Sequence, residues 1–293
     1  MANRRVLLKR QKAVRNIRKI TRTMQLIATA RFQVAMNRAT AARPYTQRLA
    51  AMVGDLSEVA VGVDHPLLKA PEDLKQAAMI VISSGRGLCG GYNGNVLRTA
   101  IGHLNGAKAE GVDNDVQMVG KKGINYFKFL KRPMVERITH IGDMPKYDDV
   151  EPLANALIDR FTKGEIASAH VAYMRFHSVG RQRATVMQLL PLTRGEEDER
   201  DARAGGARLD YEFSPQPREL LDELLPATVR VRLFQCFIDA SVSEQISRMV
   251  AMKAATDAAG DMITSLTRKY NRARQTHITM ELLDIVGGAN ALE

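Results

Sequence analysis

The sequence predicts an α/β protein: a long antiparallel coiled coil of N- and C-terminal helices with an inserted small Rossmann-like α/β domain. Three observations predict this fold. Both ends carry helical patterns longer than a compact domain needs, both bear an apolar stripe at coiled-coil spacing, and the middle alternates short strands with helices. The expected domains are an N-terminal coiled-coil helix at 1–62, the α/β domain at 74–208 and a C-terminal coiled-coil helix at 209–293.

The C-terminal helix is the most informative element. No proline follows Pro226, and Gly287 and Gly288 supply a stop signal. A helix from about Thr228 to Val286 would be roughly 90 Å long. A globular core of this size is much narrower, so part of the helix must project beyond it and find another helix or another protein to pack against. The sequence therefore indicates a mechanical or scaffolding role.

The N-terminal segment mirrors it, with neither proline nor glycine from Ala2 to Arg43. Apolar or small residues recur at spacings of four and three, broken only at Arg31 and Arg38: Val14, Ile17, Thr21, Met24, Ala28, Ala35, Ala42, Tyr45, Leu49, Met52, Leu56, Val59 and Val63. The C-terminal segment offers a matching stripe: Val242, Ile246, Met249, Thr256, Ala259, Ile263, Leu266, Tyr270 and Ala273. A repeat sustained this long predicts that the two segments wrap each other.

Charge is placed unevenly along the chain, whose net charge is +11. No acidic residue precedes Asp55, although this stretch holds many cations: Arg4, Arg5, Lys9, Arg10, Lys12, Arg15, Arg18, Lys19, Arg22, Arg31, Arg38, Arg43 and Arg48. Such a helix repels itself and gains no ion pairs between successive turns. It therefore predicts an anionic partner: acidic protein loops, nucleic acid or lipid head groups.

Composition narrows the chemistry further. The two cysteines, Cys89 and Cys236, are too few for a disulfide framework or a zinc site, and favour a reducing compartment. The histidines show no metal-ligand spacing. No apolar run approaches the eighteen or so residues of a membrane span. The basic N-terminus lacks the apolar core of a signal peptide, so it is read as mature sequence.

The middle of the chain predicts a small, mostly parallel α/β domain. The expected strands are Ala77–Ser83, Val116–Gly120, Val135–Ile141, His170–His177 and Thr185–Leu190. The expected helices are Asn95–Glu110, Gly123–Lys131 and Val150–Lys163. The charged, glycine-rich stretch Thr193–Ala207 is expected to be a surface loop.

One motif in this domain suggests an enzyme. Gly85, Gly87 and Gly90 follow a strand in the pattern G-x-G-x-x-G, which can bring backbone close to a pyrophosphate. Lys121 and Lys122 stand where the dinucleotide fingerprint needs an acid, which weakens the dinucleotide interpretation, although a basic pair could tolerate a 2′-phosphate. The favoured interpretation is a tight strand-to-helix turn. The chain also has no Walker-type phosphate loop, and catalysis by this polypeptide alone is not expected.

The chain resembles the gamma subunit of F-type ATP synthases, the central rotor stalk. Three kinds of segment carry the resemblance: Ile20–Ala28 (ITRTMQLIA), Arg86–Asn93 (RGLCGGYN), and the C-terminal runs Ser243–Asp257 and Tyr270–Gln275. Members of the family usually have an acid where Gly85 stands, so the complete glycine pattern follows from one substitution.

This resemblance implies a non-catalytic rotor subunit without a cofactor. Its terminal helices would form a shaft inside a ring of alpha and beta subunits. The α/β domain would lie beside the epsilon subunit and the membrane c-ring, whose ion-driven rotation turns the shaft. No transmembrane segment and no nucleic-acid partner are implied. The expected location is peripheral, at the cytoplasmic face of a bacterial plasma membrane.

The resemblance also assigns partner contacts residue by residue. Contacts with the alpha/beta head are expected at Arg10, Arg22, Met24, Arg248, Arg274, Gln275 and Thr279. Contacts with the membrane ring are expected at Tyr211, Glu212 and Phe213. Two departures bear on these contacts: Met280 replaces a usual glutamine near the shaft tip, and Ser214 replaces a usual glutamate at the foot.

Two alternatives belong to other functional classes. The first is a basic coiled-coil nucleic-acid-binding protein, whose affinity would fall steeply with salt, although the chain has no recognition module or stacking platform. The second is an NADP-dependent enzyme that uses the glycine loop. The sequence leaves open which ion drives the ring, and whether the parent complex is a housekeeping synthase or a paralogue.

Overall fold

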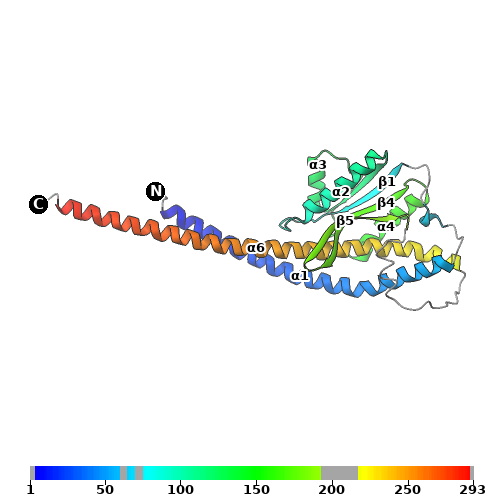
Figure 1. Ribbon diagram of the computed structural model, residues 1–293, viewed down its shortest axis with the longest axis horizontal. Helices are drawn as coiled ribbons and strands as arrows, with labels where there is room; N and C mark the ends of the chain where they lie inside the picture. Colours follow the sequence, from blue (N-terminus) through cyan, green and yellow to red (C-terminus); the bar gives the residue numbers. More distant parts are fainter. Residues whose placement is uncertain (1–3, 60–64, 70–74, 193–216, 291–293) are drawn as a thin grey trace. The chain divides into compact units, whose positions relative to one another are not determined.

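The computed structural model describes residues 4–59, 65–69, 75–192 and 217–290 (Figure 1). The chain divides into two compact units, one formed by Met1–Ala30 with Arg248–Glu293 and the other by Arg31–Ser247. We call the first the end-helix unit and the second the domain unit. The predicted domain boundaries at 62, 74, 208 and 209 fall outside the described residues and stay predictions.

Two long helices supply both ends of the chain: α1 (Arg4–Val59) and α6 (Pro217–Asn290). The predicted limits of α6 were wrong on both sides, because the helix contains Pro226 and continues through Gly287 and Gly288. Pro226 removes one backbone hydrogen bond, at a cost of about 3 kcal/mol. Its neighbours Leu225 and Val229 are completely buried, and this packing outweighs the loss.

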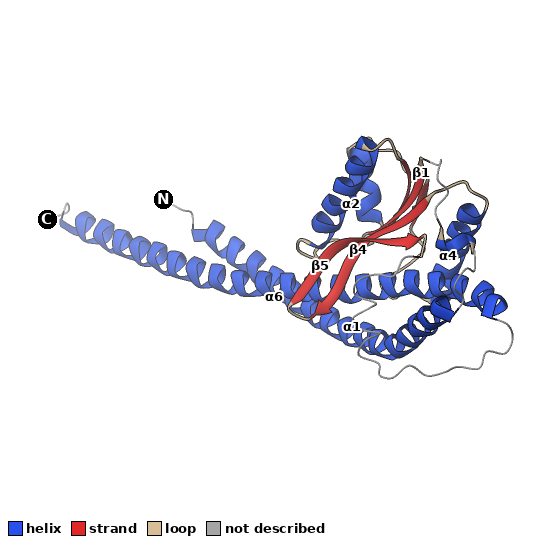
Figure 2. Cartoon of the chain, turned by 45° about the vertical axis from the view of Figure 1, so that its right-hand side comes forward, coloured by secondary structure: helices blue, strands red, loops and turns tan. Residues whose placement is uncertain are grey.

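A five-stranded sheet forms the centre of the domain unit, in the order β3-β2-β1-β4-β5 (Figure 2). Its strands are β1 (Gln76–Ile82), β2 (Asp113–Val119), β3 (Glu136–Ile138), β4 (Ser168–Ser178) and β5 (Arg181–Leu190). The other elements are the short helix η1 (Pro66–Leu68), α2 (Tyr92–Ala109), α3 (Lys121–Phe129) and α4 (Tyr147–Thr162). All pairings are parallel except β4 with β5, so the predicted strands, helices and mostly parallel sheet are confirmed.

Both faces of the sheet are covered, which explains why the central strand is apolar from Ala77 to Ile82. Alternate residues of β1 enter different cores: Ala78, Ile80 and Ile82 face α4 and α6, whereas Met79 and Val81 face α2 and α3. Helix α4 adds Leu153 and Leu157 to the first core, and α6 adds several completely or almost completely buried residues: Leu221, Leu225, Val229, Leu233, Cys236 and Phe237. The C-terminal helix is thus part of the domain's own core.

The two long helices run antiparallel within each unit. In the domain unit, Ala35 and Ala39 of α1 cluster with Val242 and Ile238 of α6. Residue numbers therefore rise along α1 in the direction in which they fall along α6. In the end-helix unit, Gln11 bonds Thr267 and Thr21 bonds Thr256, with the same opposite sense. The predicted antiparallel pairing is confirmed in both units. Among the described residues, no helix combines the length and hydropathy that a membrane crossing requires.

Candidate partner-binding surfaces

The seam of the end-helix unit, where its two helices meet, is lined largely by small and polar side chains. Thr21, Ala28, Thr256 and Ala259 are buried, and the Thr256 hydroxyl lies 2.8 Å from that of Thr21. A second polar contact joins the Gln11 side-chain amide to the Thr267 hydroxyl at 2.6 Å. Hydrogen bonds between paired helices are directional, so these two contacts define one register for the pair.

The predicted seam of α1 was wrong at Ile17, which is 52% exposed, and at Met52, which is 49% exposed. The positions that the pattern assigned to the seam drift because an α-helix repeats every 3.6 residues rather than every 3.5. Near Ile17, the exposed side chain of Arg18 reaches across to the partner helix. A Cβ added to Gly260 would lie 3.8 Å from the Arg18 guanidinium, so the glycine leaves room for it.

The outward surface of α1 is basic. Nine cations on its first turns are exposed: Arg4, Arg5, Lys9, Arg10, Lys12, Arg15, Arg18, Lys19 and Arg22. Large apolar side chains lie among them, with Ile20 59%, Leu26 56% and Ile27 48% exposed. A helix that exposes both cations and aliphatic groups is suited to a partner that is acidic and also able to cover apolar surface.

The C-terminal end of α6 exposes a second apolar surface. Six large side chains there are between 42% and 69% exposed: Ile278, Met280, Leu282, Leu283, Ile285 and Val286. Surface apolar residues are ordinary when scattered, but a run on consecutive turns marks an interaction site. Close by, His277 Nδ1 lies 3.1 Å from Glu281 Oε1, an exposed ion pair along one helix face when the histidine is protonated.

The predicted head-contact residues divide by exposure. Arg10, Arg22, Arg274, Gln275 and Thr279 are exposed, which suits contact with another protein. Arg22 donates to the Gln25 side chain at 3.0 Å, and the Thr279 hydroxyl donates to the Gln275 backbone carbonyl at 3.0 Å.

The two remaining head-contact residues are less accessible. Met24 is half-buried in the seam, and Arg248 is only 5% exposed, so much of each side chain is used within this chain. The predicted ring-contact residues Tyr211, Glu212 and Phe213, and the predicted loop Thr193–Ala207, lie outside the described residues.

The glycine loop is built as a turn. Of its three motif glycines, only Gly90 has a positive φ, of 56°. The backbone amides of Lys122 and Gly123, which open α3, donate to the Ser84 carbonyl at 3.1 Å and to Ser83 Oγ at 2.9 Å. These bonds tie the end of β1 to the start of α3, and the loop itself closes where the Tyr92 amide of α2 donates to the Cys89 carbonyl at 3.2 Å.

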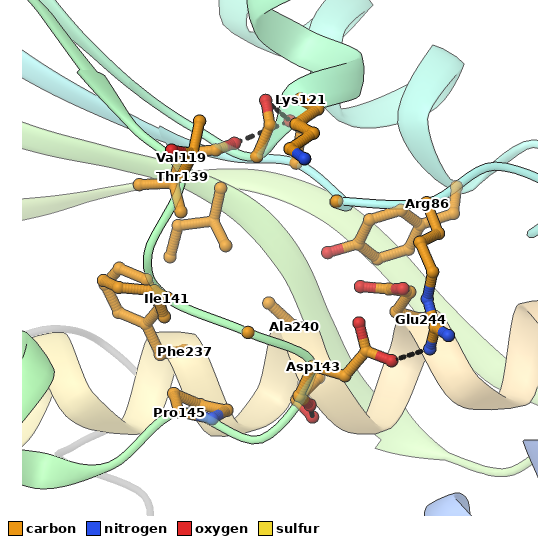
Figure 3. A pocket seen from close by; sticks show the side chains of 17 residues that line it. Arg86, Val119, Lys121, Thr139, Ile141, Asp143, Pro145, Phe237, Ala240 and Glu244 are labelled. Atoms are coloured by element: carbon orange, nitrogen blue, oxygen red, sulfur yellow. Dashed lines mark hydrogen bonds and ion pairs between the residues drawn. The ribbon is translucent and has the colours of Figure 1, made fainter.

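A cavity lies beside this loop, at the carboxyl ends of β1 and β2 (Figure 3). Its volume of about 190 Å³ is smaller than the pockets of roughly 300–1,000 Å³ that hold cofactors. Its lining includes Arg86, Lys121, Asp143 and Glu244, and Arg86 forms an ion pair with Asp143 across it. The geometry supports the turn interpretation and gives the dinucleotide alternative no support.

Three buried groups have shifted pKa values. Burial, followed by the charge of His103, lowers the pKa of His170 to about 4, and the two imidazole rings lie 4.6 Å apart. Burial raises the pKa of the Cys236 thiol and of the Tyr173 phenol, which lie together in the domain core. All three groups are neutral at pH 7, because burial disfavours the charged form of each.

The geometry defines a class of protein that combines two features. One is an α/β sheet covered by helices on both faces, and the other is an antiparallel helix pair whose outer surface stays exposed. Comparison with known sequences gives the family. A family model described as ATP synthase matches residues 3–292. ATP synthase gamma chains from Rhodopirellula baltica and Leptospira biflexa are 45% and 38% identical, each over 100% of both chains. The chain belongs to the ATP synthase gamma chain family.

Solved structures agree on the fold. In Euglena gracilis mitochondrial ATP synthase, a chain of the rotor is 15% identical with a TM-score of 0.61, and covers 94% of this chain and 98% of its own length. A chain of the OSCP/F1/c-ring structure is 16% identical with a TM-score of 0.64, and covers 99% of this chain and 94% of its own length. At these identities the likeness shows the shared fold: long terminal helices flanking a mixed α/β sheet.

Sequence reasoning missed one cluster, centred on Asp143. This residue follows the short strand β3 and carries no motif, so nothing in its local sequence singles it out. The available signal was Arg31, which breaks an otherwise apolar seam. A cation at a seam position requires a counter-charge, and the structure supplies it at Asp143.

Proposed function

We propose that this chain is the rotor shaft of an ATP synthase, which couples ion flow through a membrane ring to nucleotide chemistry in an alpha/beta head. Two observations together support the proposal: the chain belongs to this family, and it leaves two outer surfaces exposed. One surface is basic and lies along α1, and the other is apolar and lies at the end of α6. A head with acidic loops and an apolar bearing would complement both surfaces.

In this proposal the chain performs no bond chemistry. The shaft presents a different face to each beta subunit as it turns, so each subunit passes through states of different nucleotide affinity. The coupling free energy is the difference in contact energy between those states. The chain would be a peripheral subunit at the cytoplasmic face of a bacterial plasma membrane, with partners alpha, beta, epsilon and the c-ring.

The contact residues have distinct roles in the proposal. Arg10 and Arg22 would meet acidic side chains of the head, while Arg274, Gln275 and Thr279 would be gripped near the shaft tip. Met24 and Arg248 would act from less accessible positions, shaping the surface that the head meets. Tyr211, Glu212 and Phe213 would contact the ring.

The direct test is reconstitution of the alpha/beta head and membrane sector with and without this chain. ATP-driven proton pumping should require the chain, and its persistence without the chain would exclude the proposal. Arg248→Ala should reduce pumping more than Arg4→Ala, which removes an exposed cation from the same shaft. Because Arg248 is buried, the melting of each free variant must be measured too, and equal pumping defects would refute the assignment.

A second variant pair, near the C-terminal end of α6, avoids this effect on stability because its side chains are exposed. Arg274→Ala should leave the free chain's stability within about 0.5 kcal/mol of the parent, as exposed substitutions do. In the complex it should lower the chain's affinity for the head about tenfold, the effect of losing one interfacial charge contact. Arg268→Ala, another exposed cation of α6, is the matched control.

The nucleic-acid alternative has no comparable support. The family match covers almost the whole chain, and the basic surface is explained by an acidic protein partner. A salt titration with duplex DNA is expected to show only weak, sequence-blind association. Nanomolar binding that persists at physiological salt would revive the alternative.

A further inference from the structure

Asp143 touches three separate segments of the domain unit. Its carboxylate forms ion pairs with Arg31 of α1 and with Arg86 of the glycine loop. Its backbone carbonyl accepts a hydrogen bond of 2.5 Å from the Ser241 hydroxyl of α6. Figure 3 shows the Asp143 side chain turned toward Arg86, beside Glu244. One residue of a connecting loop therefore joins both long helices and the end of the central strand.

Asp143 is the more buried partner in both of its ion pairs, since the side chains of Arg31 and Arg86 are 35% and 56% exposed. The Asp143 side chain is only 19% exposed, and Glu244 of α6, itself buried, lines the same cavity. Two carboxylates thus accompany the two arginines. These are partly exposed pairs, so each one is weak, and Asp143 gains its influence by holding two arginines and Ser241 at once.

The two long helices are attached to the α/β domain unequally. Helix α6 inserts Leu225, Val229 and Leu233 into the core of the sheet, and all three are completely buried. Helix α1 buries only the small side chains Ala35 and Ala39 in its cluster with Phe176 of β4, and its larger residues Phe32 and Met36 are partly buried against that cluster. Apolar contacts are non-directional, so the small contacts of α1 resist sliding less than the deep contacts of α6 do.

We propose that Asp143 is a positioning residue that locks α1 to the α/β domain, so that a turn of the domain moves both helices together. Arg31 provides the attachment on α1, and Ser241 provides the matching one on α6. This inference rests on the proposed rotor function, because the lock matters only when torque passes through the chain. Asp143 touches neither nucleotide nor ion in this role.

The test uses the complete reconstituted complex with Asp143→Asn, which keeps the side chain's shape and removes its charge. ATP hydrolysis in uncoupled membranes should be unchanged. The number of protons pumped per ATP hydrolysed should fall roughly threefold, the scale of losing the two partly exposed ion pairs of Asp143. The deficit should widen as the opposing proton gradient rises, which a merely structural defect would not produce.

The domain offers a matched control. Arg160 Nη2 of α4 lies 2.5 Å from Asp115 Oδ2 of β2, and both side chains are 26% exposed. Asp115→Asn removes a comparable ion pair that touches neither long helix, so pumping should be unaffected. Arg31→Gln should reproduce the Asp143→Asn defect, and the double variant should be no worse than Asp143→Asn alone.

The outcomes separate cleanly. Equal pumping by Asp143→Asn and Asp115→Asn, in a system where the parent chain couples normally, would overturn the lock. A folded parent chain that fails to couple at all would instead overturn the rotor function. If Asp143→Asn melts too low to assemble, Arg31→Gln provides the test instead. This variant leaves the contacts of Asp143 with Arg86 and Ser241 in place. Normal pumping by the Arg31→Gln complex would refute the proposal.

Discussion

The two units of the molecule are stabilised in opposite ways. The α/β domain completely buries large apolar side chains such as Met79, Ile80 and Phe127. The end-helix unit buries the large apolar residues Leu7 and Met252 but otherwise mainly small or polar ones, such as Thr21 and Ala259, and it leaves Ile17 and Leu283 more than half exposed. The domain therefore covers its own large apolar residues, whereas the end helices leave most of theirs exposed to a partner.

The most direct test of this difference between the units is to truncate one large apolar residue in each. Phe127→Ala should destabilise the domain by about 4 kcal/mol, because it leaves a cavity in a filled core. Ile17→Ala should change the stability of the free chain by less than about 0.5 kcal/mol. Urea denaturation of both variants measures the difference, and similar losses would mean that Ile17 is packed within the chain.

The turn that opens α3 should be the next most sensitive position. Gly120 has a φ of 90°, and a Cβ added there would lie 2.2 Å from the Ser83 carbonyl oxygen. Gly120→Ala should therefore cost about 3 kcal/mol through backbone strain and displacement. Gly102→Ala is the control, since nothing lies within 4 Å of its added Cβ and alanine favours the helix there. Equal stability of the two variants would contradict the tight turn.

The domain should also respond to acid through His170. Its pKa is about 4 in the folded chain and 6.5 ordinarily, so the unfolded chain takes up the proton first as the pH falls. Stability is thus complete above pH 6.5 and is lost between pH 6.5 and 4. Allowing for partial exposure, the loss is about 2 kcal/mol. His170→Gln should flatten that part of the pH–stability curve, and an unchanged slope would show that other groups carry it.

The smallest expected effect lies in the seam of the end helices. Thr21→Val keeps the side-chain shape and removes the hydrogen bond with Thr256, at a cost of about 1 kcal/mol. Hydrogen exchange of amides within 4–30 and 248–290 should report it, since these segments can open without unfolding the domain. Thr256→Val should add little to Thr21→Val. Fully additive losses would mean that the two hydroxyls do not act as a pair.

The elements predicted correctly from the sequence were those with the strongest local pattern of apolar residues. Every strand of the described sheet was predicted because apolar runs such as Met79–Ile82 alternate with helical stretches. The C-terminal stripe from Val242 to Ala273 was also found, since it repeats regularly. Ile17 was misplaced because a four-and-three spacing does not determine which of two adjacent residues faces the partner helix.

The helix ends were less predictable for a similar reason. Pro226 and the glycines near the C-terminus are valid stop signals in isolation, yet α6 contains all of them. The burial of Leu225 and Val229 overrides the signal at Pro226, and a local pattern cannot register packing against a sheet distant in sequence. The burial of Arg248 was equally invisible, because a motif match carries no information about exposure.

The sequence by itself determined the plan of this protein: two helical ends that pair, a basic N-terminal surface, a mostly parallel sheet between them, and its family. The structural features come from periodicity and composition, which act between near neighbours, and the family comes from the resemblance of particular motifs. Only the tertiary structure decided that Asp143 meets Arg31, that serines occupy the amides at the start of α3, and that α6 completes the core of the sheet. Those contacts join residues far apart in the chain, and their energies depend on burial that exists only once the chain has folded.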